Sequence, residues 1–240
     1  MSLSATPDGV LLVDKAAGMT SHDVVAFVRR QLRIKKVGHC GTLDPIATGL
    51  LILTLGRGTK IQDLLMSEDK EYVGTLSLGK TTDTQDRAGR VIEERPVPEL
   101  RPETVQAAFD KFRGDFYQMP PMVSAIKQGG VPLYKLAREG KTVEREPRLV
   151  HVYRSSIDRI APPEIDFTVL CSKGFYVRTY AHDIGETLGC GAHLQELRRT
   201  RSGRFDLSRA VTFEQIKTAD PVEILGKILT LPEVSRMRGA

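Results

Sequence analysis

The sequence predicts an α+β protein, in which helices flank a mixed and largely antiparallel central sheet. Segments with strand-like alternation and segments with helical periodicity follow one another without a regular βαβ order. The chain has 240 residues, of which 40% are hydrophobic, and this is enough for a proper core. Its three cysteines are too few for a disulfide framework. We therefore expect a fold that is held together by packing.

The first expected elements are a strand over residues 10–15 and a helix that begins after Thr20. The stretch from Thr20 to Asp23 has the Thr-x-x-Asp pattern of a capping box. Apolar residues at positions 25, 28 and 32 share one face, which predicts a helix that runs to about Arg33. Residues 50–55 are uncharged and almost entirely apolar, which is typical of a central strand that is covered on both faces.

The glycine-rich segment of residues 38–51 surrounds Asp44, the only acidic residue between Asp23 and Gln62. Basic residues come shortly before it, so Asp44 is an isolated carboxylate beside a cationic surface, which suggests chemistry on a polyanion. Asp followed by Pro also begins many helices, with Asp as the N-cap. The residues of this segment alone leave both interpretations open.

The middle of the chain contains a literal phosphate-loop pattern at residues 74–81. That motif needs a strand before its first glycine and a helix at its lysine. Here residues 71–78 alternate like a strand, and residues 82–89 read as an extended polar loop after a short helix over residues 59–66. We therefore do not favour nucleotide binding.

The second half is expected to contain a helix over residues 103–112 and strands over residues 150–157 and 164–171. The strand pattern continues from Phe175 to Arg178, a helix follows to Leu188, and residues 202–205 form a turn into another strand. The last thirty residues are expected to form a helix or two. Residues 119–148 are rich in proline, glycine and lysine, and form either a basic excursion or an ordinary irregular connection.

Charge and composition narrow the function classes. The net charge is +5, and basic residues cluster at residues 29–36 and 198–204, which fits either a phosphate-tracking face or solvated helix faces. The histidines and cysteines lack the paired spacing of zinc sites, and there is no G-x-S-x-G element. We see neither a signal peptide nor an apolar run long enough to span a membrane, so we expect a soluble cytoplasmic protein.

Seven motifs, in order along residues 10–210, resemble the bacterial tRNA pseudouridine synthases of the TruB family. They are Asp14-Lys15 with Gly18 and Thr20-Ser21, Gly38 to Leu51, Lys70-x-Tyr72, Gly79 with Thr82 to Asp86, Gln118 to Lys127, Cys171 to Arg178, and Leu197 to Phe205.

The resemblance implies a pseudouridine synthase fold with an RNA-binding cleft across the sheet. It implies a catalytic domain over residues 1–210, in which residues 119–148 are a mobile insertion that clamps RNA. Residues 211–240 are expected to be a short C-terminal helical extension in place of the full PUA-type domain in which family members usually continue.

The implied activity is the isomerisation of uridine to pseudouridine at position 55, in the T-loop of tRNA, after the base is flipped out. The reaction is redox-neutral and transfers no outside group, so we expect no cofactor and no metal. The implied partner is the tRNA T-arm stem-loop, bound by a monomer that needs no protein partner. Two alternatives stay open: a tRNA-folding chaperone with dispensable catalysis, and a guide-dependent synthase that acts on ribosomal RNA.

The resemblance also implies roles for individual residues. Asp44 matches the catalytic aspartate, Arg178 pairs with it, and Tyr176 helps to remove the C5 proton. The implied substrate-binding residues are Tyr72, which stacks on the target base, His39, which fills the gap left by that base, Leu197, Lys15 and Lys173. Weaker contacts with the RNA backbone are expected from Arg198, Arg199, Arg201 and Lys127.

Overall fold

The computed structural model describes residues 7–124, 126–141 and 143–239, which fold into two compact units. The first unit contains the described residues up to Tyr72 together with those from Arg198 onward, and the second contains Val73–Leu197. Two strands, β4 (Lys70–Leu78) and β12 (Ala192–Ser202), carry the chain between the units. Each unit is described by itself.

The sheet of the first unit is built around β3 (Thr48–Leu55), in the order β14-β1-β3-β12. Strand β1 (Gly9–Lys15) pairs with β3 in antiparallel fashion along its whole length, and β2 (Val37–Cys40) pairs with the end of β3. Strand β12 runs parallel to the start of β3. Every residue from position 49 to position 55 is buried, which confirms a central strand covered on both faces.

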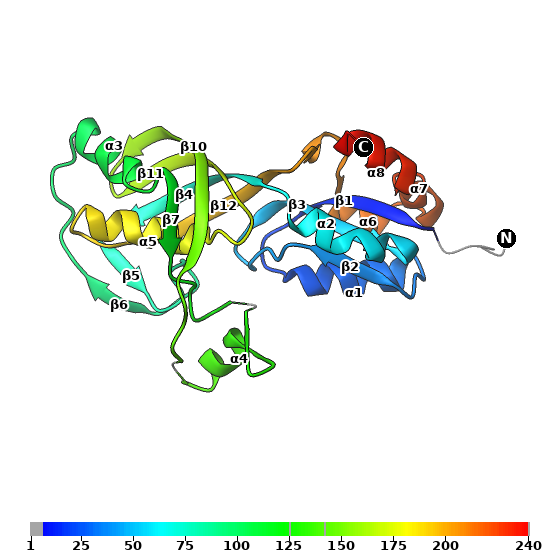
Figure 1. Ribbon diagram of the computed structural model, residues 1–240, viewed down its shortest axis with the longest axis horizontal. Helices are drawn as coiled ribbons and strands as arrows, with labels where there is room; N and C mark the ends of the chain where they lie inside the picture. The colour runs from blue at the N-terminus through cyan, green and yellow to red at the C-terminus, as the bar shows by residue number, and fades with distance from the viewer. Residues whose placement is uncertain (1–6, 125, 142, 240) are drawn as a thin grey trace. The chain divides into compact units, whose positions relative to one another are not determined.

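The first helix, α1 (Ser21–Gln31), begins with the expected capping box, in which the Thr20 hydroxyl accepts from the Asp23 N–H. It ends two residues earlier than expected, because Arg33 has a left-handed main chain with φ of 54°. After β3 the chain forms a 3₁₀ turn η1 (Gly56–Ile61) and α2 (Gln62–Met66), as expected for residues 59–66. Figure 1 shows α1, in blue, and α2, in cyan, close to β2 and β3.

The C-terminal residues belong to the first unit and pair with β1. The segments are β13 (Phe205–Asp206), η2 (Leu207–Arg209), β14 (Val211–Thr212), α6 (Phe213–Thr218), α7 (Pro221–Leu225), β15 (Leu229–Thr230) and α8 (Leu231–Arg238). Strands β14 and β15 each pair with β1. The expected helix or two is thus three short helices among the described residues. Asp220 caps the second of them, and Thr230 begins the third with a capping box.

One buried cluster joins the sheet of the first unit to its helices. Leu12 of β1 and Ile52 of β3 pack with Leu65 of α2 and Val234 of α8. Because side chains alternate along a strand, Leu51 and Leu53 belong to the opposite face of the sheet, and they too are fully buried. The sheet therefore has a core on both faces, and the loops at the ends of β3 are held by buried neighbours.

The second unit has the strand order β12-β4-β11-β10-β7. Strands β10 (Arg148–Ala161) and β11 (Glu164–Cys171) form a long antiparallel pair, and β7 (Gly114–Gln118) pairs with β10. The helices are α3 (Pro102–Asp110) and α5 (Val177–Thr187), drawn in green and yellow in Figure 1. Their side chains Phe109 and Tyr180 meet Phe167 of β11 edge to face, with ring centroids 5.8–5.9 Å apart.

Short elements fill the loops of the second unit. Strands β5 (Lys80–Thr82) and β6 (Val91–Glu94) form a hairpin, so the lysine of the phosphate-loop pattern lies in a strand and not at the start of a helix. This confirms the rejection of that motif. The segment of residues 119–148 contains β8 (Lys127–Gln128), β9 (Val131–Pro132) and α4 (Leu133–Arg138).

The prediction of a strand from Phe175 to Arg178 was wrong. Tyr176 is the N-cap of α5, and Arg178 lies in the first turn of that helix. Aromatic and β-branched residues such as Tyr176 and Val177 favour a strand locally. In the structure, Val177 and Tyr180 are both buried on α5, three residues apart, which is the spacing of one helix face. Tertiary packing therefore decides the conformation of this stretch.

Candidate active site

Asp44 lies in the loop between β2 and β3. Residues 45–47 form a turn that is closed by a 3.0 Å hydrogen bond from the Ala47 N–H to the Asp44 carbonyl, and β3 follows. The interpretation of Asp44 as a helix cap was therefore wrong, because Pro45 begins a turn and not a helix. Asp44 is half-buried in this loop.

A buried hydroxyl fixes the residue before Asp44. The Ser21 Oγ, at the start of α1, accepts a 2.8 Å hydrogen bond from the Leu43 N–H and donates a 3.1 Å bond to the Leu43 carbonyl. On the other side, the Gly18 N–H donates to the Pro45 carbonyl at 2.8 Å. The loop on both sides of Asp44 is thus held by the segment that joins β1 to α1.

Lys15 lies at the end of β1 and is fully buried. Its Nζ donates to the carbonyls of Ala16 and Met19, at 2.9 and 2.8 Å. Burial lowers the pKa of Lys15 to about 8, while the negative charge of Asp44 partly offsets this shift. Lys15 and Asp44 are therefore close enough to interact electrostatically, and Lys15 favours the ionised form of Asp44.

Arg199 is only 1% exposed, although its neighbours in the sequence are half-buried arginine and threonine. Its Nε donates to the Leu50 carbonyl at 2.6 Å and its Nη2 to the Gly41 carbonyl at 3.2 Å. These two carbonyls lie on either side of Asp44 along the chain. The arrangement favours a role in holding this loop over the predicted contact with an RNA phosphate.

The other arginines of this cluster are paired with acids. Arg198 binds Asp14 through two hydrogen bonds of 2.7 and 3.1 Å, and Arg201 binds Glu71 at 3.3 Å. Both are partly exposed, with side-chain exposures of 42% and 41%. A phosphate that reached them would compete with these carboxylates. The side chain of Lys127, the fourth predicted backbone contact, lies outside the part of the chain that the structure describes.

His39 and Tyr72 belong to the first unit. His39 lies in β2 opposite Leu53, and burial lowers the pKa of its imidazole. Its Nδ1 is buried and forms no hydrogen bond with any described residue. Tyr72 lies in β4 and is 8% exposed. His39 is therefore neutral near pH 7, and the packing of Tyr72 is compatible with a role as a stacking wall.

The second unit positions Tyr176 through its main chain. Gln118, at the end of β7 and 2% exposed, accepts from the Tyr176 N–H at 2.8 Å and donates to the Tyr176 carbonyl at 3.1 Å. Lys173, three residues before Tyr176, is exposed in the turn after β11. Leu197 is 8% exposed in β12, farther along the chain. Gln118 begins one of the family motifs, and the sequence alone gives it no role.

Arg178 is 4% exposed and is held by acceptors from two other segments. Its guanidinium donates to the carbonyls of Thr84 and Val123, at 2.8 and 2.6 Å, and its Nε lies 3.8 Å from a carboxylate oxygen of Asp86. Asp86 in turn accepts from the Thr84 hydroxyl at 2.7 Å. In the sequence, Asp86 is only one position of the family motif, and an acid in a polar loop gives no sign that it is buried.

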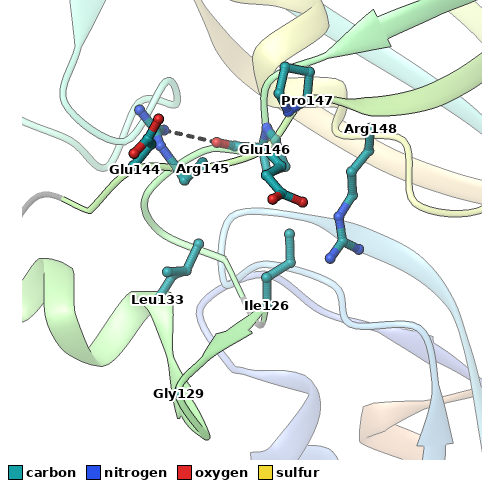
Figure 2. A pocket seen from close by; sticks show the side chains of 9 residues that line it. Ile126, Gly129, Leu133, Glu144, Arg145, Glu146, Pro147 and Arg148 are labelled. Carbon is teal, nitrogen blue, oxygen red and sulfur yellow. Dashed lines mark hydrogen bonds between the residues drawn. The ribbon is translucent and has the colours of Figure 1, made fainter.

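A cavity of about 560 Å³ lies within the segment of residues 119–148 (Figure 2). Its lining residues are Pro120, Ile126, Gly129, Leu133, Glu144, Arg145, Glu146, Pro147 and Arg148. Arg145 crosses the base of this segment with a 2.8 Å hydrogen bond to the Pro120 carbonyl. Four of the nine lining residues are charged, two acids and two arginines, so the cavity is polar.

Two further kinds of feature are absent from the residues that the structure describes. Among them, no group of histidine, cysteine, aspartate or glutamate side chains has the arrangement of a metal site. No helix in the same residues has the length and apolar character needed to cross a bilayer.

Comparison with protein families shows two matches that together cover most of the chain. Residues 29–177 match the model of the TruB family pseudouridylate synthase N-terminal domain. Residues 178–223 match that of the tRNA pseudouridylate synthase B C-terminal domain.

Curated relatives are similar over nearly the whole chain. The tRNA pseudouridine synthase B of Opitutus terrae is 53% identical over 95% of this chain and 91% of its own length. That of Geobacter sulfurreducens is 51% identical over 94% of this chain and 74% of its own length.

Solved structures show a similar fold. In a crystal structure of a Cbf5-Nop10-Gar1 complex, the matched chain has a TM-score of 0.73 and 28% identity over 95% of this chain. In a crystal structure of the archaeal box H/ACA sRNP Nop10-Cbf5 complex, the matched chain has a TM-score of 0.66 and 30% identity over 91% of this chain. This chain spans 62% and 58% of those two chains. On the family matches and the curated relatives together, the chain belongs to the TruB family of pseudouridylate synthases.

Proposed function

We propose that this protein converts uridine to pseudouridine at position 55 in the T-loop of tRNA. The observation that carries the proposal is the 53% identity, over 95% of the chain, to a relative named tRNA pseudouridine synthase B. A loop held on both sides by buried groups, with a half-buried carboxylate at its centre, supports the proposal in physical terms.

Asp44 is the proposed catalytic carboxylate. The isomerisation breaks the bond between N1 of uracil and C1′ of ribose and forms a bond between C5 and C1′, while the C5 proton is lost and N1 gains one. Asp44 acts in its ionised form, on the sugar or on the base, and the charge of Lys15 favours that form. Arg178 pairs with Asp44, and Tyr176 helps to remove the C5 proton.

The substrate-binding roles stay proposals on the same basis. Tyr72 stacks on the flipped base, since stacking on an aromatic ring is how single-stranded bases are commonly bound. His39 fills the gap left by that base, and Leu197 forms an apolar wall. Lys15 and Lys173 complete the proposed binding set, with residues 119–148 as the segment that clamps RNA.

Release of tritium from tRNA labelled at C5 of uridine tests the proposal. The wild-type protein is expected to release label from one T-loop uridine, whereas Asp44→Asn, which keeps the shape of the side chain, is expected to release almost none. Equal release by both proteins would overturn the role of Asp44. Mapping pseudouridine in the product tRNA checks the position.

We also propose that the protein acts as a cytoplasmic monomer on the T-arm stem-loop. Three free, buried cysteines fit a reducing compartment. The structural likeness to Cbf5 chains, which are solved in complexes, raises the alternative of a guide-dependent synthase. Activity on a bare T-arm hairpin, with no guide RNA and no added protein, would argue against that alternative.

A tRNA-folding role is the second candidate from the sequence. An Asp44→Asn variant that still binds tRNA can be used to distinguish a folding role from catalysis. Full rescue of a deletion strain by this variant would favour folding of tRNA over catalysis, whereas failure to rescue, at equal protein level, would favour catalysis.

A further inference from the structure

We propose that five exposed cations at the end of α1 form the surface on which this protein binds RNA phosphates. This basic patch consists of Arg29, Arg30, Arg33, Lys35 and Lys36, all within eight residues of the chain and all exposed. The inference rests on the proposed function for the identity of the RNA.

The pairing of charges distinguishes the basic patch from the other basic cluster. Within the described residues, none of its five side chains forms an ion pair, whereas Arg198 is paired with Asp14 and Arg201 with Glu71. Arg199 is buried and bonded to main-chain carbonyls. Cations without internal carboxylate partners are available to a polyanion at no cost in broken ion pairs.

The distribution of charge over the chain agrees with this choice. Acidic and basic residues balance in the second unit, so the whole net charge of +5 comes from the first unit, which contains the basic patch. Five like charges within eight residues repel one another, and this repulsion is relieved when an RNA backbone neutralises them. Ordinary solvated helix faces usually interleave acids with bases, and this patch does not.

The main chain at Arg33 gives an independent indication. Arg33 has φ of 54°, in the left-handed region, directly after the C-cap of α1. The Ile34 N–H bonds the Arg29 carbonyl at 3.1 Å across it, which is the 6→1 bond of a Schellman motif. Glycine is strongly preferred at this position, because the Cβ of any other residue is strained in the left-handed region. An arginine that breaks a local rule at a cost in stability indicates a functional site.

Buried residues anchor the turn that carries Arg33, and the helix before it leads back to the proposed active-site loop. Leu32 and Ile34 are 3% and 2% exposed and anchor the turn on both sides of Arg33. The other end of α1 carries Ser21, which binds Leu43 beside Asp44. An eleven-residue helix spans about 16 Å, at about 1.5 Å per residue. A substrate bound at Asp44 can therefore reach the patch with a phosphate a few nucleotides away.

The helix dipole alone does not explain the patch. Positive charge near a helix C-terminus is favourable, and this accounts for Arg29 and Arg30 in the last turn. Lys35 and Lys36 lie beyond the helix, and the dipole effect falls off within the last turn. The main chain of Arg33 is strained at its position. If stability alone determined the residue here, we would expect glycine or asparagine.

Arg33→Gly separates binding from folding because the two effects have opposite signs. The glycine relieves the left-handed strain, so the midpoint of thermal unfolding is expected to rise. The loss of one phosphate contact is expected to weaken binding of a tRNA transcript severalfold and to lower the slope of log Kd against log salt by about one. Lys227→Gln, which removes one exposed charge elsewhere in the same unit, is expected to leave both readouts unchanged.

A triple variant tests the patch as a whole. Arg30→Gln with Lys35→Gln and Lys36→Gln is expected to weaken tRNA binding by at least about tenfold near 0.1 M salt. The matched control changes Lys60, Lys227 and Arg236 to Gln, three exposed cations of the first unit that form no ion pair within the described residues, so it removes the same charge outside the patch.

Two results would overturn the proposal. One is unchanged tRNA affinity and salt slope in both patch variants, and the other is an equal loss in the triple control, which would mean that only net charge matters. Binding is measured directly by titration, so absence of pseudouridine formation by the wild type would remove the proposed function without deciding the role of the patch.

Discussion

The Nε of Arg199 donates a 2.6 Å hydrogen bond to the carbonyl of Leu50, at the start of the strand that follows Asp44. The same guanidinium reaches the Gly41 carbonyl, so one buried side chain joins the two ends of the loop that presents Asp44. Arg199→Gln is expected to lower the free energy of unfolding by about 2–4 kcal/mol, because buried carbonyls lose their donors. Denaturation in urea measures this loss.

Kinetic measurements on Arg199→Gln separate a role in positioning Asp44 from a general loss of stability. We expect Arg199→Gln to lower kcat at least about tenfold with little change in KM, because a shift of the Asp44 carboxylate harms the reaction more than binding. Arg199→Lys keeps the charge but cannot reach both carbonyls as a planar fork, so it should recover stability only in part. An unchanged kcat in a folded Arg199→Gln protein would contradict the positioning role.

Gly49 and Gly18 form a matched pair for testing close approach of main chains. Both have positive φ, of 96° and 85°. A Cβ on Gly49 would lie 2.3 Å from the Arg199 carbonyl oxygen, whereas a Cβ on Gly18 would meet nothing within 4 Å. Gly18→Ala is therefore expected to cost about 1–2 kcal/mol of stability from strain alone. Gly49→Ala adds a clash within the sheet and is expected to cost about 3 kcal/mol or more. Equal losses in urea denaturation would contradict this reading.

Gln118 is expected to control the position of Tyr176. Gln118→Leu keeps the apolar volume but removes both hydrogen bonds to the Tyr176 main chain, which costs about 1–3 kcal/mol for the buried groups left behind. If Tyr176 takes part in the reaction, kcat falls while tRNA binding is kept. Gln106→Leu, an exposed glutamine on α3, is the control and should behave like wild type. A normal kcat in the Gln118→Leu protein would show that the reaction does not depend on the two hydrogen bonds from Gln118 to the Tyr176 main chain.

The stability of the protein is expected to rise with pH through the titration of Lys15. Its pKa is about 8 in the folded protein, against 10.5 for an ordinary lysine, so between these values the unfolded chain binds more protons than the folded one. The contribution of Lys15 is therefore fully present above pH 10.5 and is lost as the pH falls through about 8. In Lys15→Met it is absent at every pH.

Urea denaturation of both proteins at several values between pH 7.5 and 10 measures this effect. The wild type should gain stability relative to Lys15→Met as the pH rises across that range. Asp44→Asn removes the charge that opposes the shift, so it should lower the pKa of Lys15 further. A constant difference between wild type and Lys15→Met would contradict the burial of a titrating amine.

Local patterns predicted much of the fold correctly. The capping box at Thr20, the apolar run of residues 50–55 and the alternation of residues 164–171 each became the expected element. These patterns depend on contacts within a few residues, or on burial that the residue types themselves report. The strand β2 was missed because its four residues contain glycine and histidine, and only pairing with β3 keeps them extended.

Environment was harder to predict than conformation. Arg199 and Arg201 flank Thr200 and look alike in the sequence. Arg199 is nevertheless buried, whereas Arg201 is partly exposed and paired with Glu71. Side chains two residues apart lie on the same face of a strand, so alternation does not separate the two arginines; Arg199 pairs with Gly49 of β3, whereas Arg201 pairs with Asp206 of β13. Nothing local to the arginines contains this information, because the partner strand lies 150 residues earlier in the chain.

The sequence by itself determined the fold class, the family and the segment that carries Asp44, because these depend on residue types and on their order. Only the tertiary structure decided which cations serve the fold and which are open to a partner. A buried arginine must satisfy its donors on carbonyls, as Arg199 does, whereas the cations that end α1 keep their charge exposed. The difference arises from the pairing of distant strands, which sets solvent access for each side chain.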